Sequence, residues 1–165
     1  MAVTRRLTAA DAEELTALRV RNRTYISEYE PDWDDPDAYY SVEGVRAWIV
    51  DGHERFAVLD GTAIAGMISL TGIVYGALCT ANLGYFVDVD RNGRGLATRA
   101  IGEVVDYGFG ELGLHRVEAG TAVDNIASQR VLEKNRFTRV GLLRAHLLIH
   151  GEWVDHYLWE RIVGD

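Results

Sequence analysis

The stretch from Asn82 to Thr98 constrains the fold most, because it joins three kinds of local structure. It reads N-L-G-Y-F-V-D-V-D-R-N-G-R-G-L-A-T. Its first part is apolar and rich in β-branched and aromatic residues, Gly93 and Gly95 interrupt it, and a helical apolar pattern follows directly. This order predicts a strand, a glycine turn and the N-terminus of a helix.

Such a turn is suited to binding an anion. The first N–H groups of a helix have no helical acceptor and carry a partial positive charge. Glycines also let a ligand come close to the backbone. The stretch lacks the P-loop pattern G-x-x-x-x-G-K-[ST] and the third glycine of the dinucleotide fingerprint. On these residues alone, an ordinary β-turn leading into a helix remains the alternative.

The other patterns predict an α/β (α+β) fold, with a mixed sheet of six to seven strands and helices on both faces. Thr8 and Asp11 resemble a capping box, Asp60-Gly61 suits a hairpin, and Asp124 is expected to cap a helix. Helices are expected over about 9–22, 42–50, 96–111 and 126–134. Strands are expected near residue 5 and over about 56–59, 64–70, 82–89, 115–121, 138–149 and 152–162.

The segment from Arg23 to Pro36 is expected to be a loop. It contains both prolines of the chain, which disfavour a regular element, and is dense in aromatic and carboxylate side chains. Aromatic rings supply contact area and carboxylates attract amines, so one interpretation is a substrate rim. The other is a surface loop packed on its own aromatics.

Composition limits the class of protein. The length of 165 residues suits a single domain over 1–165, and no apolar run reaches the ~20 residues that span a bilayer. With no signal peptide recognisable at the N-terminus, we expect a cytoplasmic protein without a membrane partner. The net charge of −8 disfavours nucleic acid and favours cationic partners. The single cysteine, Cys79, and scattered histidines and carboxylates lead us to expect no metal.

The segment Asn92-Gly93-Arg94-Gly95-Leu96-Ala97 resembles the pyrophosphate loop of the GCN5-related N-acetyltransferases (GNAT), Q/R-x-x-G-x-G/A. Asn92 stands at the usual Gln/Arg position, which contributes mainly its backbone. The resemblance implies acetyl-CoA as co-substrate. The implied binding residues are Phe86, Val87, Val89, Asn92, Gly93, Arg94, Gly95, Leu96, Ala97, Thr98, Asn125 and Ser128.

The segment from Asp124 to Phe137 is similar to the second acetyl-CoA motif of that family, N-x-x-S-x-x-[VL]-x-x-[KR]-x-G-F. The resemblance implies that Asn125 lines the pantetheine arm and that Ser128 gives a proton to the leaving thiolate. Arg136 replaces the usual glycine, which makes this turn sterically tighter. Without the family, Asn125 and Ser128 are ordinary capping residues of a first helical turn.

Three further segments resemble the RimJ/RimL-type enzymes, which acetylate the N-terminal residue of ribosomal proteins, and are closest to the alanine-directed branch. These segments are 22–31, 84–85 and 147–156. The resemblance implies direct transfer from acetyl-CoA, in a ternary complex, to the α-amine of a protein that starts with Ala or Ser. It also implies a homodimer.

The attacking amine must be neutral, so a base or a water chain is expected. Leu147 stands where some Rim-type relatives have Glu, and His146 stands where the alanine-directed branch has Tyr. The candidates are Glu30, Glu118, His146 and Asp155. Glu118 and His146 have an alternative as ordinary strand residues, and Asp155 as a partner for a loop backbone.

Two other functions fit the same patterns. One is a small-molecule acetyltransferase that modifies an amino sugar, a polyamine or a toxin. The other is an acyl-CoA sensor without turnover, against which the presence of Ser128 and Asn125 argues. A free-α-amine peptide, a lysine peptide and small amines should distinguish these functions.

Overall fold

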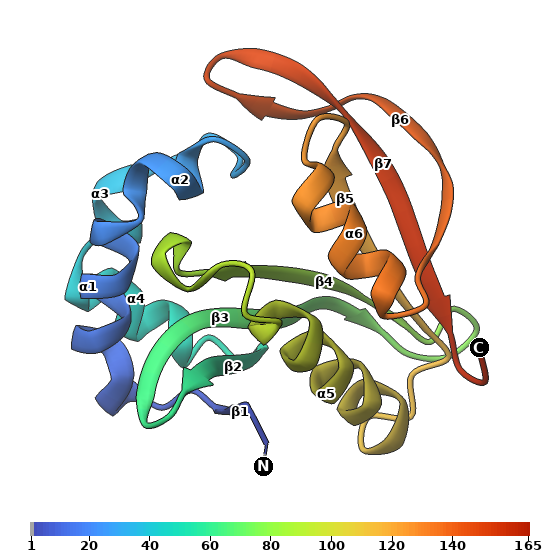
Figure 1. Ribbon diagram of the computed structural model, residues 1–165, viewed down its shortest axis with the longest axis horizontal. Helices are drawn as coiled ribbons and strands as arrows, with labels where there is room; N and C mark the ends of the chain where they lie inside the picture. The colour runs from blue at the N-terminus through green and yellow to red at the C-terminus, as the bar shows by residue number, and fades with distance from the viewer. Residues whose placement is uncertain (1) are drawn as a thin grey trace.

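The computed structural model describes residues 2–165, and its central feature is one seven-stranded sheet in the order β1-β2-β3-β4-β5-β7-β6 (Figure 1). The strands are β1 Thr4–Arg6, β2 Glu54–Asp60, β3 Ala63–Val74, β4 Thr80–Val87, β5 Arg116–Ala122, β6 Thr138–Ile149 and β7 Glu152–Ile162. Only the β4–β5 pair is parallel. The predicted mixed, mostly antiparallel α/β sheet is therefore confirmed.

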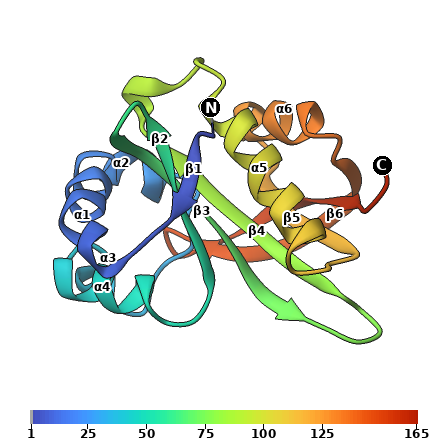
Figure 2. The ribbon, with the colours of Figure 1, turned by 90° about the horizontal axis from the view of Figure 1, so that it is seen from below.

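Helices cover both faces of the sheet, as predicted (Figure 2). The α-helices are α1 Ala12–Arg21, α2 Arg23–Ser27, α3 Pro36–Tyr39, α4 Val42–Ile49, α5 Leu96–Gly110 and α6 Ile126–Lys134, with short 3₁₀ turns at Ala9–Asp11 (η1) and Val89–Arg91 (η2). On one face, Ile101 and Val104 of α5 pack against sheet residues such as Val117. On the other, Leu15 of α1 and Val45 of α4 pack against it. No helix within residues 2–165 is long and apolar enough to cross a membrane.

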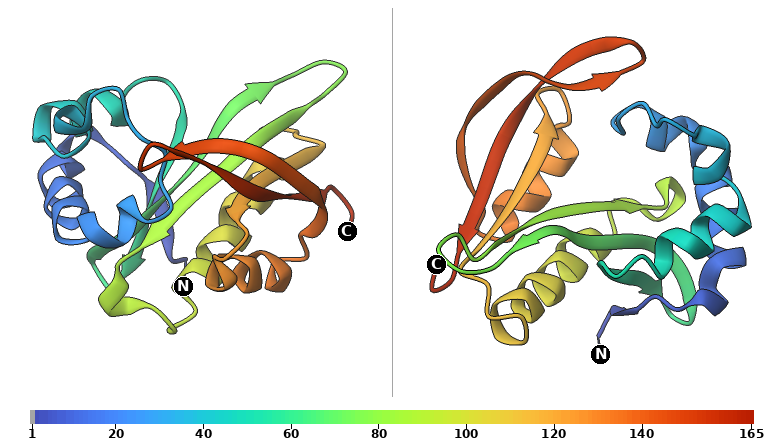
Figure 3. Two further views of the ribbon diagram at one scale, coloured as in Figure 1. Left: turned by 90° about the horizontal axis from the view of Figure 1, so that it is seen from above. Right: turned by 180° about the vertical axis from the view of Figure 1, so that it is seen from behind.

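Strands β4 and β5 separate soon after they pair. Their register joins only Thr80–Asn82 to Arg116–Glu118, after which β4 follows β3 as far as Val87 and β5 follows β7 as far as Ala122. The two strands diverge, and the N-terminal end of α5 and the helix α6 lie on either side of the opening (Figures 1 and 3). From Leu83 onward, the edge of β4 that faces β5 has no strand partner among the described residues.

The prediction of a loop over 23–36 is wrong over Arg23–Ser27, which forms α2, and at its last residue, Pro36, where α3 begins. Proline is compatible with α3, since Pro36 stands in the first turn, where a backbone N–H has no helical acceptor. The Asp35 carboxylate accepts the Ala38 N–H at 3.0 Å and caps this helix. The predicted capping box at Thr8–Asp11 is confirmed, and Ser41 caps α4.

Two further boundaries differ from the prediction. Strand β4 ends at Val87 rather than Val89, because the chain turns into η2, where the Val89 N–H donates to Asn22 Oδ1 at 2.9 Å. The cap of α6 is Asn125 rather than Asp124, since its Oδ1 accepts the Ser128 N–H at 3.0 Å. The first error comes from a contact that is distant in sequence, and the second from neighbouring residues with similar local preferences.

Candidate active site

The glycine turn presents unpaired backbone N–H groups at the start of α5. Gly93 and Gly95 both have φ near 74°, a left-handed conformation that favours glycine, and Gly95 is the N-cap. The first helical hydrogen bond runs from the Arg99 N–H to the Gly95 carbonyl at 3.1 Å. The preceding N–H groups therefore lack helical acceptors. A Cβ added at Gly95 would meet no atom within 4 Å, so the turn is open.

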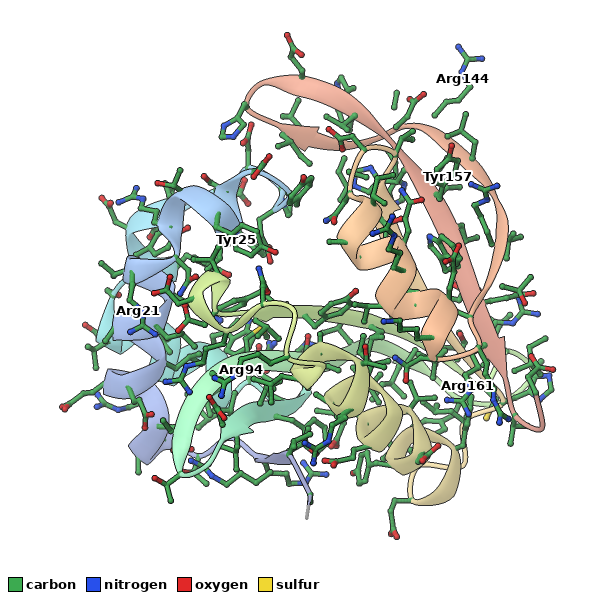
Figure 4. All side chains as sticks on the ribbon, viewed as in Figure 1. Arg21, Tyr25, Arg94, Arg144, Tyr157 and Arg161 are labelled. Carbon is green, nitrogen blue, oxygen red and sulfur yellow. The ribbon has the colours of Figure 1, made fainter. Side chains whose placement is uncertain are left out.

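Two carboxylates hold this turn in place. Asp60 accepts from Arg91 at 3.2 Å and from Arg94 at 2.6 Å (Figure 4). Asp88 is buried and accepts from Arg21 at 2.5 Å and from Asn22. Burial opposes ionisation, but these hydrogen bonds keep the pKa of Asp88 below its ordinary value. The turn is thus preorganised, with its N–H groups exposed.

On the other side of the opening, α6 presents Ser128. The Asn125 cap fixes the Ser128 backbone, and the Ser128 Oγ lies 2.6 Å from the hydroxyl of Tyr85 on β4. Burial raises the pKa of Tyr85 to about 12, although the Ser128 hydrogen bond opposes this shift. Tyr85 is therefore a neutral hydroxyl at physiological pH. The Tyr85–Ser128 pair connects β4 to α6 beyond the point where β4 and β5 separate.

A cavity of about 350 Å³ lies between the segment that follows α2 and the β6–β7 turn. Asp32 joins these two regions: its carboxylate accepts the N–H groups of His150 and Gly151, each at 2.8 Å, and its own N–H donates to the Leu148 carbonyl at 2.9 Å. The two hydrogen bonds to the carboxylate lower its pKa. The lining residues are Arg23, Ser27, Glu30, Pro31, Asp32, Trp33, Pro36, Tyr40 and His150.

Glu30 lies in the wall of this cavity, and its carboxylate forms no hydrogen bond to any described residue. Burial raises the pKa of Glu30 to about 6, and the positive charge of Arg19 opposes the shift. Arg19 is itself fully buried, with its guanidinium carbon 4.2 Å from the ring centroid of Tyr39 and 4.3 Å from that of Trp48. Glu30 is therefore mostly ionised at neutral pH, yet more basic than an ordinary carboxylate.

The other predicted base candidates have different partners. Glu118 is 3.6 Å from Arg116 in an ion pair, and its neighbours Val117 and Ala119 point to the opposite, α5-covered face. His146 is exposed on β6, with its ring centroid 5.4 Å from that of His156; slight burial and the charge of His156 lower its pKa. Within residues 2–165, no hydrogen bond or ion pair connects Glu118 or His146 to Glu30 or Ser128.

The structure gives Asp155 the role of a backbone partner, which was its predicted alternative. Its carboxylate accepts the Ala145 N–H at 2.7 Å, at an irregularity of the β6–β7 register between Leu143 and Leu147. Ala145 has φ of 47°, so this carboxylate stabilises an unusual conformation. Among residues 2–165, no group of three or more His, Cys, Asp or Glu side chains is arranged to hold a metal ion.

Comparison with known proteins identifies the family. Residues 3–138 match the sequence model of the family "Acetyltransferase (GNAT) domain". The chain belongs to the GNAT family. It is an N-acetyltransferase that uses acetyl-CoA as its co-substrate.

Its GNAT relatives include enzymes with named acceptors. A probable N-acetyltransferase of Bacillus subtilis, YjcK, is 42% identical, covering 92% of this chain and 88% of its own length. The structure of the ribosomal-protein-S5-alanine acetyltransferase of Vibrio fischeri superposes with a TM-score of 0.91 at 27% identity, over 98% of this chain and 93% of the other. Mycobacterium smegmatis RimJ, in complex with CoA-disulfide, gives 0.88 at 28% identity, over 97% and 81%.

The residues of this GNAT site fit acetyl-CoA. The open turn at Gly95 and its unpaired N–H groups suit the pyrophosphate, and Arg94 adds a positive charge beside them. The free edge of β4 from Leu83 to Val87 offers backbone groups to the pantetheine amides. Val89 does not extend this edge, because it lies in η2 and its N–H is already bound to Asn22.

Three residues of this region make side-chain contacts that were not predicted. Tyr85 shares one face of β4 with Leu83 and Val87. A hydroxyl group on this otherwise apolar face was the sequence feature that could have indicated its contact. Tyr25 of α2 lies above the glycine turn, where the Asn92 amide reaches its hydroxyl at 3.5 Å (Figure 4). Asp32 was seen only as part of an acidic loop, since its partners lie more than a hundred residues away.

Proposed function

We propose that this GNAT enzyme acetylates the N-terminal α-amine of a protein that begins with Ala or Ser, as in ribosomal proteins. The observation that carries this proposal is the similarity to the ribosomal-protein-S5-alanine acetyltransferase over 98% of the chain. Coverage of that extent includes both segments that line the cavity, 23–40 and His150. The acceptor part of the molecule therefore shares the similarity along with the cofactor part.

The described side chains suggest how a proton moves. The nitrogen lone pair of the acceptor bonds to the thioester carbonyl carbon, and the C–S electron pair goes to sulfur. Glu30, directly or through water, takes the proton that the nitrogen loses, and Ser128 gives one to sulfur. The products are the amide and the free thiol. Ser128 regains a proton from solvent while Glu30 releases one, so both side chains return to their starting states and atoms and charge balance. We assign stabilisation of the oxyanion to a backbone N–H near Phe86 or Val87 on β4.

Glu30 suits an α-amine in particular. An α-amine has a pKa near 8, so a substantial fraction is already neutral at the pH of the cell. A carboxylate with a pKa of about 6 is then sufficient as the base, directly or through water. A lysine side chain, with a pKa near 10.4, would need a stronger base. The charge of Glu30 also attracts the protonated form of the amine to the cavity.

A small amine is the second candidate acceptor. The volume of about 350 Å³ lies within the range of ~300–1,000 Å³ that is typical of small-molecule sites. Trp33 and Tyr40 add aromatic surface to the acidic wall, which suits an amino sugar or a polyamine as well as a peptide terminus.

The test is thiol release from acetyl-CoA with a panel of acceptors. The panel contains peptides that start with Ala or Ser, the same peptides with a blocked N-terminus, a peptide whose only amine is lysine, polyamines and aminoglycosides. We expect turnover with the free Ala and Ser peptides and none after blocking. Turnover with small amines and with no peptide would mean that the acceptor is a small amine, the second candidate.

Binding of acetyl-CoA without turnover of any acceptor would instead favour the sensor. The Glu30→Gln variant is the internal check on the site, and Glu28→Gln, an exposed carboxylate two positions away, is its matched control. We expect Glu30→Gln to abolish most of the turnover of the peptide and Glu28→Gln to leave that turnover unchanged.

A further inference from the structure

The hydroxyl of Tyr85 forms a contact that the proposed reaction does not use. It lies 2.6 Å from Ser128 Oγ and 3.4 Å from the Ser128 carbonyl oxygen. Tyr85 stands on β4 after the last residue that pairs with β5, and Ser128 stands on α6. The two side chains therefore meet across the separation of the strands, next to the edge that suits the pantetheine.

The chemistry of the two hydroxyls sets the direction of this hydrogen bond. A phenol is a stronger acid than a primary alcohol, so Tyr85 is the better donor and Ser128 Oγ the better acceptor. With Oγ accepting from Tyr85, the serine proton is free to point away toward a third atom. The Ser128 backbone cannot readily rotate out of this arrangement, because its N–H is bound to the Asn125 cap.

We propose that Tyr85 is a positioning residue of the transfer reaction, which acts through Ser128 by orienting its proton toward the leaving sulfur and by replacing that proton as it departs. This inference rests on the proposed role of Ser128. It assigns a function to the hydroxyl of Tyr85 that is separate from the packing of its ring.

The proton balance follows directly. As the C–S bond breaks, the Ser128 proton goes to sulfur and the Tyr85 proton goes to Ser128 Oγ, which avoids a serine alkoxide. The negative charge then rests on the Tyr85 oxygen, which regains a proton from solvent. The nitrogen of the acceptor has lost one proton to Glu30 or water, so no net charge is created.

The simplest alternative is that the contact only ties β4 to α6. A structural tie would affect folding or acetyl-CoA affinity, whereas a proton relay affects kcat. The split between kcat and the acetyl-CoA affinity separates the two. Double-mutant analysis then tests whether Tyr85 acts through Ser128, because residues that act through one another are not additive.

The experiment compares Tyr85→Phe, Ser128→Ala and the double variant, using the acceptor that gives the fastest thiol release. Tyr107→Phe is the matched control, since the Tyr107 hydroxyl also makes hydrogen bonds, to Arg6 and Glu54, but lies outside the site. The measurements are kcat, the KM of each substrate, and the Kd of acetyl-CoA by calorimetry.

We expect Ser128→Ala to lower kcat by ~100-fold, within the range of proton-transfer contributions. Tyr85→Phe should lower it by ~10-fold, less than this range, because Ser128 keeps its own proton in that variant. The Kd of acetyl-CoA should change less than ~2-fold, and the double variant should match Ser128→Ala, since Tyr85 acts only through that serine. Tyr107→Phe should retain the parental kcat.

Four results would overturn the inference. An unchanged kcat in Tyr85→Phe, with Ser128→Ala impaired, would remove Tyr85 alone and leave the proposed function intact. A normal kcat in Ser128→Ala would remove the role of Ser128 and the inference with it. Additive losses in the double variant would mean that Tyr85 does not act through Ser128. A loss of acetyl-CoA affinity in Tyr85→Phe would make the contact a structural tie.

Discussion

The cofactor half and the acceptor half of the site are built in different ways. The cofactor half uses backbone N–H groups of one continuous stretch, from the free edge of β4 through the glycine turn to α5. The acceptor half uses side chains of two segments that Asp32 joins across more than a hundred residues. Backbone recognition does not depend on the identity of the side chains, whereas side-chain contacts can change with the acceptor. The two halves should therefore fail separately when mutated.

The largest effect is expected from Gly95→Val. The new side chain would stand over the open N–H groups, and loss of one or two charge-assisted hydrogen bonds, ~1.5–3 kcal/mol each, corresponds to ~100-fold weaker acetyl-CoA binding. Calorimetry measures the Kd. The matched control is Gly113→Val beyond the other end of α5, where φ is 65° and the space is equally open, so the backbone strain is similar. Equal losses in both variants would mean that strain, not the turn, explains the result.

Glu30→Gln should have the next largest effect, on the acceptor half alone. We expect ~100-fold lower kcat/KM for the peptide and unchanged acetyl-CoA affinity, because a base is lost while the turn is intact. In the parent enzyme, activity should rise with pH as Glu30 loses its proton near pH 6, and rise further toward about pH 8 as the acceptor α-amine becomes neutral. A pH–rate profile in saturating acetyl-CoA measures this. If the rise in activity near pH 6 persisted in Glu30→Gln, the titrating group would be a residue other than Glu30.

Asp32→Ala should raise the peptide KM by ~10-fold, since the cavity wall loses its connection to the β6–β7 turn. Asp34→Ala, an exposed change in the same loop, is the control. The lowered pKa of Asp32 means that the carboxylate supports this connection at neutral pH and ceases to do so as pH falls through the lowered value. A larger change in the Kd of acetyl-CoA than in the peptide KM would contradict the separation of the halves.

The smallest effect concerns the cap that holds Ser128. Asn125→Ala should cost about 1 kcal/mol of stability, as losses of N-caps do, while Asp124→Ala should cost little because its side chain makes no cap bond. Thermal unfolding measures both. Equal destabilisation would contradict the assignment of the cap to Asn125.

The cofactor half could be predicted from the sequence because its information is local. A strand, two glycines and a helix follow one another between Leu83 and Thr98, and the chain direction alone places them. The tighter turn expected from Arg136 in place of glycine is also confirmed, since its φ is 62°. Where local preferences are nearly equal, as between Asp124 and Asn125, the prediction missed by one residue.

The acceptor half could not be predicted to the same depth. Nothing near Asp32 in sequence indicates that it binds the backbone of His150 and Gly151, because that contact arises from the return of the β6–β7 turn toward α2. The raised pKa of Glu30 likewise depends on burial by distant elements. The proline rule failed at α3 because it depends on the position of Pro36 within the helix.

The most direct test of the two-part site is a crossed measurement on Gly95→Val and Asp32→Ala. The Kd of acetyl-CoA and the KM of an Ala-starting peptide are measured for both variants, with the peptide KM of Gly95→Val taken at saturating acetyl-CoA. We predict that Gly95→Val changes only the Kd of acetyl-CoA and that Asp32→Ala changes only the KM of the peptide. If each variant changed both constants to a similar extent, the site would be one coupled unit and the separation of its halves would be wrong.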